Sequence, residues 1–189
     1  MSFVEKVEAN GPVELRRVRD IMIPLAKYPW IRLKDSLLDA IEKMEDAHLE
    51  VGRRPSLPRV LLVFDHHEEL VGIVRRRDLM RGLEPDFLVQ QPLESRVTHF
   101  NMEIDGHLTE LSEGLSLEAV IKGLQEHSAR PISEVMRPIS TTLKPSDRLM
   151  KAVFEMVSLN ESLIAVVDGE EVLGVVRSVD LLHELAELL

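Results

Sequence analysis

The sequence of 189 residues contains no cysteine, few aromatic residues and no long apolar run. The absence of cysteine excludes disulfide bonds, thiolate metal sites and a cysteine nucleophile. The longest apolar runs, such as residues 60–64, have five residues, whereas a membrane-spanning helix needs about 20. The first residues lack a basic stretch followed by an apolar one, so no secretory signal is visible. We therefore expect a soluble, cytoplasmic protein that does not contact membranes.

The charge balance argues against nucleic acid as a partner. The sequence has 33 acidic and 23 basic residues, for a formal net charge of −10, and an acidic surface disfavours binding to nucleic acid. Aromatic residues make up only 4% of the chain, so few side chains could stack on nucleic-acid bases. The basic residues are unevenly distributed, because seven arginines fall between residues 53 and 81.

Three sequence landmarks occur twice in the same order, which indicates an internal repeat. In the first and second copies, respectively, they are RDIMIP at 19–24 and SEVMRP at 133–138, VLLVFD at 60–65 and LIAVVD at 163–168, and GIVRRRD at 72–78 and GVVRSVD at 174–180. The first landmarks are 114 residues apart and the last 102, so the first copy has 12 additional residues. Most of these lie within residues 48–58, which we expect to form a polar loop.

Apolar spacing predicts the same elements in both copies. In the first copy, a helix capped by Ser36 or Asp35 has Leu38, Ile41 and Leu49 at its apolar positions. A buried strand, a tight turn and a second strand follow. A closing helix then starts at Asp78, and its equivalent in the second copy starts at Asp180. The order β-α-β-β-α, present twice, indicates an α/β or α+β protein with two equivalent halves.

The segment between the copies, residues 86–130, matches neither of them and is acidic. Ser116 can cap a helix with Leu117, Val120, Ile121 and Leu124 on one face. We therefore expect an ordered, partly helical insertion. The predicted organisation is an N-terminal segment at 1–15, a first unit at 16–85, the insertion at 86–130 and a second unit at 131–189.

The repeated motifs resemble a tandem pair of CBS domains, the modules named after cystathionine β-synthase. The resemblance implies two β-α-β-β-α units that pack with pseudo-twofold symmetry. It also implies a non-catalytic regulatory protein that requires no cofactor and signals by a conformational shift to an unidentified protein partner. Ligands of the family are adenosyl compounds, here ATP, ADP, AMP, S-adenosylmethionine or NAD, bound in clefts between the units. Such pairs often form homodimers.

The ends of the two copies supply the first candidate ligand-binding residues. Gly72 and Gly174 permit a close backbone approach on a strand. Asp78 and Asp180 stand where a strand meets a helix, so each carboxylate could accept hydrogen bonds from the two hydroxyl groups of a ribose. The alternative role is structural, because Asp is also a common helix N-cap.

Both copies depart from the family pattern at one position. Where the family usually has Thr or Ser, three residues after the glycine, this chain has Arg75 and Arg177. A guanidinium can bind phosphate with two hydrogen bonds, which would favour a polyphosphate ligand. Alternatively, each arginine pairs with Asp78 or Asp180 and closes the cleft, which would make the chain a ligand-free structural or assembly module.

Further candidate contacts come from the resemblance alone. They are Ile31, Arg32, Thr141 and Thr142 on the first strand of each copy, and Pro58, Arg59, Ser162 and Leu163 at the start of the second strand. The sequence contains no phosphate-binding loop, zinc-binding motif or nucleophile–base pattern that would indicate an enzyme. We therefore expect no catalytic residues and no metal site.

Overall fold

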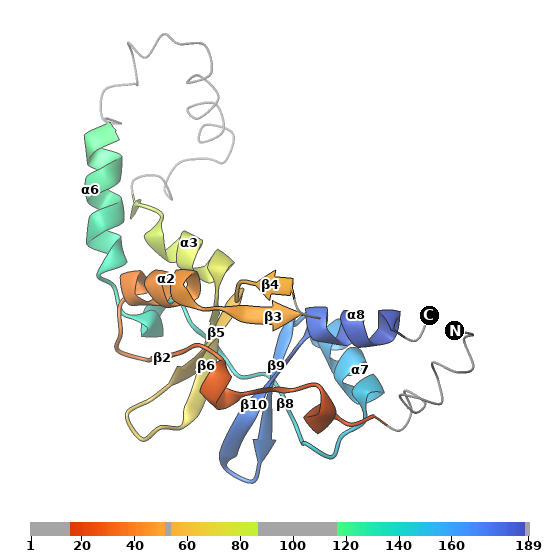
Figure 1. Ribbon diagram of the computed structural model, residues 1–189. Coiled ribbons are helices and arrows are strands. Elements are labelled where there is room, and N and C mark those ends of the chain that lie inside the picture. The colour runs from red at the N-terminus through yellow and green to blue at the C-terminus, as the bar shows by residue number, and fades with distance from the viewer. Residues whose placement is uncertain (1–15, 52–53, 87–116, 188–189) are drawn as a thin grey trace.

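The computed structural model describes residues 16–51, 54–86 and 117–187. They form two units that lie side by side, each with a four-stranded sheet and helices packed against it (Figure 1). The elements before the insertion are η2 (Val18–Asp20), β1 (Ile23–Pro24), η3 (Leu25–Lys27), β2 (Trp30–Arg32), α2 (Leu37–Asp46), β3 (Leu49–Val51), β4 (Arg54–Ser56), β5 (Val60–Phe64), β6 (Leu70–Arg75) and α3 (Arg76–Leu83). Those that follow are α6 (Leu117–Ser128), η5 (Ile132–Glu134), β7 (Arg137–Pro138), β8 (Thr142–Leu143), α7 (Leu149–Leu159), β9 (Leu163–Asp168), β10 (Glu171–Arg177) and α8 (Ser178–Ala186).

The two units exchange their first strands. The first sheet has the order β2-β5-β6-β7 and the second the order β1-β10-β9-β8, so each sheet contains one short strand from the start of the other copy. Pro24 lies opposite Gly174, and Pro138 lies opposite Gly72. A Cβ atom at Gly174 would overlap the carbonyl oxygen of Ile23, and one at Gly72 would lie 2.5 Å from the carbonyl oxygen of Arg137. The close approach that these glycines permit is therefore to the exchanged strand.

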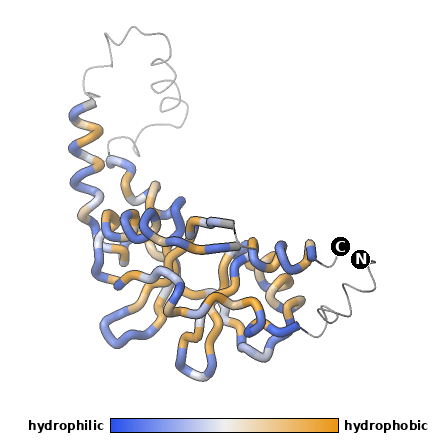
Figure 2. Tube along the Cα trace, viewed as in Figure 1, coloured by the Kyte–Doolittle hydropathy of each residue, from blue (hydrophilic) through white to orange (hydrophobic). Residues whose placement is uncertain are grey.

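A shared apolar core holds the units together. One cluster of buried residues contains Val60 and Leu62 of the first sheet and Leu163 and Val175 of the second. Two further clusters lie between each sheet and its own helices. Figure 2 shows that the turns of the two long hairpins, β5–β6 and β9–β10, are hydrophilic where they extend away from this core. Burial of the apolar strand residues on both faces is the main stabilising contribution expected for such a sheet pair.

Tyr28 forms a polar link between the segment after β1 and the first sheet inside this core. Its hydroxyl group donates a 2.7 Å hydrogen bond to the carbonyl oxygen of Val60. Burial raises the pKa of Tyr28 above its usual value, with Arg177 acting in the opposite direction. The phenol therefore stays neutral and serves as a hydrogen-bond donor from the segment after β1 to the first sheet.

The structure confirms the predicted fold class and both copies of the repeat. The helix expected after Ser116 is present as α6, and it packs against α3 and α2 of the first unit (Figure 1). None of the helices in the described ranges is long and apolar enough to cross a membrane.

Two predictions for the segment between α2 and β5 were wrong. The helix α2 ends at Asp46, so Leu49 is not part of its apolar face. Residues 48–58 also do not form a plain loop, because β3 and β4 pair as a short antiparallel hairpin in which Leu49 lies opposite Ser56. Leu49 is buried in the core shared by the units, and this burial explains why the segment adopts strand geometry despite its polar composition.

Candidate functional site

The end of β10 carries the more enclosed of two equivalent Arg–Asp pairs. The guanidinium of Arg177 donates two hydrogen bonds of 2.7 Å to the carboxylate of Asp180, one from Nε and one from Nη2. It also donates to the carbonyl oxygen of Glu50 at 3.0 Å and to Oγ of Ser56 at 3.4 Å. Because the side chain of Arg177 is only 7% exposed, these contacts satisfy a buried charge.

The arginine of the equivalent pair at the end of β6 is more exposed. Nε of Arg75 lies 3.2 Å from Oδ2 of Asp78, and Nη1 lies 3.7 Å from Oε2 of Glu161. The same Asp78 oxygen also accepts a 3.1 Å hydrogen bond from the backbone N–H of Arg75. The side chain of Arg75 is 21% exposed. Among the residues that the structure describes, its contacts are longer and fewer than those of Arg177.

Both arginines connect the two units. Arg177 belongs to the second unit, and its partners Glu50 and Ser56 lie on the β3–β4 hairpin of the first. Arg75 belongs to the first unit, and Glu161 precedes the first long strand of the second. Any change in the relative position of the units must therefore alter these contacts.

The aspartates lie two residues further into their helices than the sequence predicted. Because α3 begins at Arg76 and α8 at Ser178, Asp78 and Asp180 are third in their helices rather than first. A carboxylate in the first turn of a helix stabilises the helix, because it lies at the positive end of the helix dipole. Each aspartate thus has a structural role that does not depend on a ligand.

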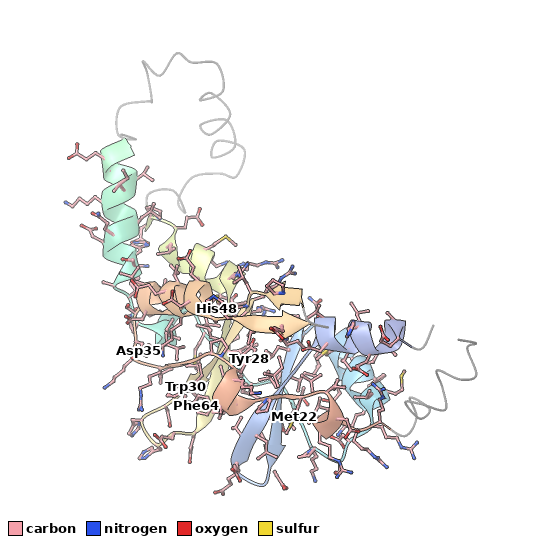
Figure 3. The ribbon with its side chains drawn as sticks, viewed as in Figure 1. Met22, Tyr28, Trp30, Asp35, His48 and Phe64 are labelled. Atoms are coloured by element: carbon pink, nitrogen blue, oxygen red, sulfur yellow. The ribbon has the colours of Figure 1, made fainter. Side chains whose placement is uncertain are left out.

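A large pocket lies between the β3–β4 hairpin and β1, next to Arg177. Its volume is about 620 Å³, within the usual range for small-molecule sites. In Figure 3, His48 marks the hairpin side of this pocket and Met22 the β1 side. The lining residues are Met22, Ile23, Pro24, Lys27, Ala47, His48, Leu49, Glu50, Pro55, Ser56 and Leu57. We call this cavity the hairpin pocket.

A second pocket adjoins the first at Ser56 and Leu57, which line both. It has a volume of about 320 Å³ and lies where the two units meet. Its lining residues are Tyr28, Ser56, Leu57, Arg59, Val60, Ser162, Leu163, Arg177, Ser178, Val179 and Leu182. We call this cavity the seam pocket.

The structure brings some of the predicted site residues together and separates others. Leu163, Arg59, Ser162 and Arg177 line the seam pocket. Ile31 is fully buried in the core of the first unit. The others lie apart from both pockets: Thr141 donates to Glu155, Thr142 is exposed on β8, Pro58 is buried after the hairpin, and Arg32 lines a groove beside Trp30.

The contacts of Glu50, Ser56 and Glu161 were not anticipated from the sequence. All three residues touch an arginine of the other unit. The only available signal was that the first copy has additional residues at the position of Glu50 and Ser56. That signal did not indicate their orientation toward the second unit.

Comparisons with known proteins agree with this geometry. The CBS domain family matches residues 18–85 and 132–187, more than half of the chain. The chain belongs to the CBS domain family. Two matched segments, the strand exchange and the paired sheets make it a tandem CBS pair. No curated protein matches it.

Solved structures support the fold of this CBS pair. A CBS domain-containing protein of unknown function from Bacillus anthracis is 16% identical, with a TM-score of 0.61 and coverage of 93% of this chain and 96% of that one. The CBS domain of a bacterial CNNM/CorC family Mg²⁺ transporter, solved with ATP, is 14% identical, with a TM-score of 0.60 and coverage of 98% and 95%. CBSX2, solved with AMP, is 16% identical, with a TM-score of 0.57 and coverage of 91% and 97%.

Proposed function

We propose that this CBS pair is a non-catalytic regulatory module that binds an adenine nucleotide in the cleft beside Arg177 and Asp180. The observation that carries the proposal is the pair of adjoining cavities at this cleft, which Ser56 and Leu57 connect. The hairpin pocket has a largely apolar wall that suits a base, and Arg177 lies where it meets the seam pocket. AMP and ATP occupy relatives of the same fold, which supports an adenosyl ligand.

Signalling follows from the position of the ligand between the units. Arg177 and Arg75 hold the units in the present arrangement through contacts across their boundary. A nucleotide that binds against the hairpin favours an arrangement with different cross-unit contacts. The response depends on the difference between its affinities for the two arrangements. The regulated protein would read this shift from outside the chain. A nucleotide sensor of this kind fits the cytoplasmic location expected from the sequence.

Thermal unfolding in the presence of a ligand panel tests the proposal. The panel is AMP, ADP, ATP with and without Mg²⁺, S-adenosylmethionine and NAD. A ligand at 100 times its dissociation constant adds about 2.7 kcal/mol to the free energy of unfolding, a shift of roughly 5–10 °C for a domain of this size. Changing Asp180 to Ala, which removes the partner of Arg177 beside both pockets, should reduce the shift, and Asp78→Ala at the other cleft should not. An unchanged shift in Asp180→Ala would remove this aspartate from the site.

A second candidate function is a ligand-free assembly module with clefts closed by internal Arg–Asp pairs. The observation that favours it is the bidentate contact between Arg177 and Asp180. The two functions differ in one measurable respect. The assembly module shows no stabilisation by any member of the panel, in protein that is folded and free of co-purified nucleotide.

The helices of the second unit present a surface for a second copy of the chain. Met150, Phe154 and Val157 are 51%, 70% and 77% exposed and lie on one face of α7, beside exposed Leu182 on α8. The positions of Phe154 and Val157 on α7 correspond to Glu42 and Glu45 on α2. Because α2 has these glutamates where α7 has Phe154 and Val157, the exposed apolar surface is larger on the described part of the second unit, and we expect a homodimer through α7 and α8.

The mass of the protein in solution tests the homodimer. Light scattering after size exclusion should give twice the chain mass of 21.5 kDa, and Phe154→Asp should give the chain mass. A matched control is Leu38→Asp, which places the same charge at an exposed apolar position of α2. A monomeric wild-type protein would contradict the homodimer.

A further inference from the structure

The seam pocket has the chemistry of an anion-binding site. Its lining includes two arginines, three serines and Tyr28, and the described lining residues include no carboxylate side chain. This composition is unusual in a chain with a net charge of −10. The first turn of α8, at Ser178 and Val179, also lines the pocket and adds the positive end of a helix dipole.

Of the two arginines in this pocket, Arg177 has little remaining capacity for a ligand. A guanidinium has five N–H donors, and Arg177 uses four of them in its hydrogen bonds with Asp180, Glu50 and Ser56. Its charge is also neutralised by the bidentate contact with Asp180. Arg177 therefore serves mainly to hold the cleft together.

Arg59 is in a different situation. Its side chain is exposed and lines the seam pocket opposite Ser162 and Ser178 of the other unit. Within the described part of the chain, Arg59 forms no ion pair. Its backbone is fixed, because the carbonyl oxygen of Arg59 accepts a 3.1 Å hydrogen bond from the N–H of Arg76. A fixed backbone with an uncommitted guanidinium is a suitable arrangement for binding an incoming anion.

The second unit has no equivalent of this charge. Ser178 donates its backbone N–H to the carbonyl oxygen of Ser162, just as Arg76 does to Arg59, so Ser162 occupies the position of Arg59. The first unit also has exposed Arg76 and Arg77 at the start of α3. Among the described residues, the unpaired arginine of the pocket thus comes from the first unit, whereas two of its three serines, Ser162 and Ser178, come from the second.

We infer that Arg59, with the serines of the seam pocket, binds the phosphate chain of the ligand and makes the site selective for nucleoside di- and triphosphates. This inference rests on the proposed function and assigns the two cavities to different parts of one ligand. The hairpin pocket takes the base and sugar, and the seam pocket takes the phosphates. Arg75 and Arg177 then have a positioning role through their aspartates instead of a clamp role.

Calorimetric titration of four proteins tests the assignment. The proteins are the wild type, Arg59→Ala, Arg59→Lys and the control Arg77→Ala, which removes the same charge from an exposed position that does not line either pocket. Each is titrated with AMP, ADP, ATP and inorganic pyrophosphate. Arg59→Ala should weaken ADP and ATP binding on the order of 10- to 100-fold, as expected for loss of a charged hydrogen bond. The affinity of Arg59→Ala for AMP should fall less than its affinity for ADP and ATP. Arg59→Lys should show a smaller loss of ADP and ATP affinity than Arg59→Ala. Arg77→Ala should bind all four ligands as the wild type does.

The outcomes separate this inference from the proposed function. Equal losses for AMP and ATP, or no loss in Arg59→Ala, overturn the phosphate assignment while leaving nucleotide binding intact. If the wild type binds no nucleotide, the proposed function fails, and pyrophosphate then decides the inference. Pyrophosphate binding that depends on Arg59 supports the anion site on its own, and absence of pyrophosphate binding overturns it.

Discussion

The two halves of this CBS pair carry the same Arg–Asp pair at the same place, yet they differ in how it is enclosed. Arg177 is 7% exposed and makes four hydrogen bonds, whereas Arg75 is 21% exposed and its side chain contacts two carboxylates among the described residues. The difference arises from the β3–β4 hairpin. This hairpin belongs to the first unit but covers the arginine of the second.

The comparison shows how a small insertion can make two equivalent clefts unequal. The second cleft gains a wall from the hairpin and, with it, the hairpin pocket. The first unit instead gains α6, which packs on its helices, and the additional arginines around α3. The two halves have thus kept the fold of the repeat while acquiring different surfaces.

The largest expected effect is the loss of Arg177. Arg177→Ala leaves the nearly buried carboxylate of Asp180 without its partner, and we expect a loss of about 3–5 kcal/mol in the free energy of unfolding. Arg75→Ala should cost less, about 1–2 kcal/mol, because the guanidinium contacts that are lost are longer and Asp78 keeps its hydrogen bond from the backbone N–H at position 75. Urea denaturation of both variants measures the difference, with exposed Arg77→Ala as the control. Equal losses for the two arginines would contradict the asymmetry.

The next effect concerns the hairpin itself. Leu49 is 6% exposed and packs in the core shared by the units, so Leu49→Ala should cost about 2–4 kcal/mol. The matched control is Leu38→Ala on α2, where the leucine is 47% exposed, and its cost should stay below about 1 kcal/mol. If both variants unfold at the same urea concentration, the hairpin is not anchored as described.

The smallest effects are expected on the free energy of unfolding at low pH. They concern one aspartate at the start of the first long helix of each unit. Hydrogen bonds from the backbone and side chain of Ser36 lower the pKa of Asp39. Burial opposes the charge of Asp147, but hydrogen bonds from Lys151 and the backbone of Lys144 outweigh it and lower the pKa of Asp147.

Both carboxylates therefore stabilise the fold above their unfolded pKa of 3.8, and this stability is lost as the pH falls through their lower folded values. The free energy of unfolding should therefore decrease as the pH is lowered from about 5 to about 2, a range that spans the unfolded and folded pKa values of the two carboxylates. Asp39→Asn and Asp147→Asn should each reduce that decrease. A pH dependence that neither substitution changes would assign it to other groups.

The sequence predicted the fold more completely than the site, for a physical reason. Apolar runs and turn residues are local signals, so the repeat identified both units, and the helix after Ser116 was correctly predicted. The hairpin was missed because Pro55 and the neighbouring arginines are typical of a loop, and only the distant core explains the burial of Leu49. The sequence left the Arg–Asp pairing open as one of two alternatives. The cross-unit contacts of Arg177 with Glu50 and Ser56 join residues more than 120 positions apart, and no local pattern encodes them.

The most direct test of the account is a crystal structure of the protein with ADP. The account predicts the base in the hairpin pocket beside Met22 and His48, and the phosphates in the seam pocket on Arg59 and the serines. It also predicts that Arg177 keeps its contact with Asp180. The central claim is that the ligand binds in the cleft covered by the β3–β4 hairpin. ADP bound only beside Arg75 and Asp78, with the hairpin and seam pockets empty, would contradict it.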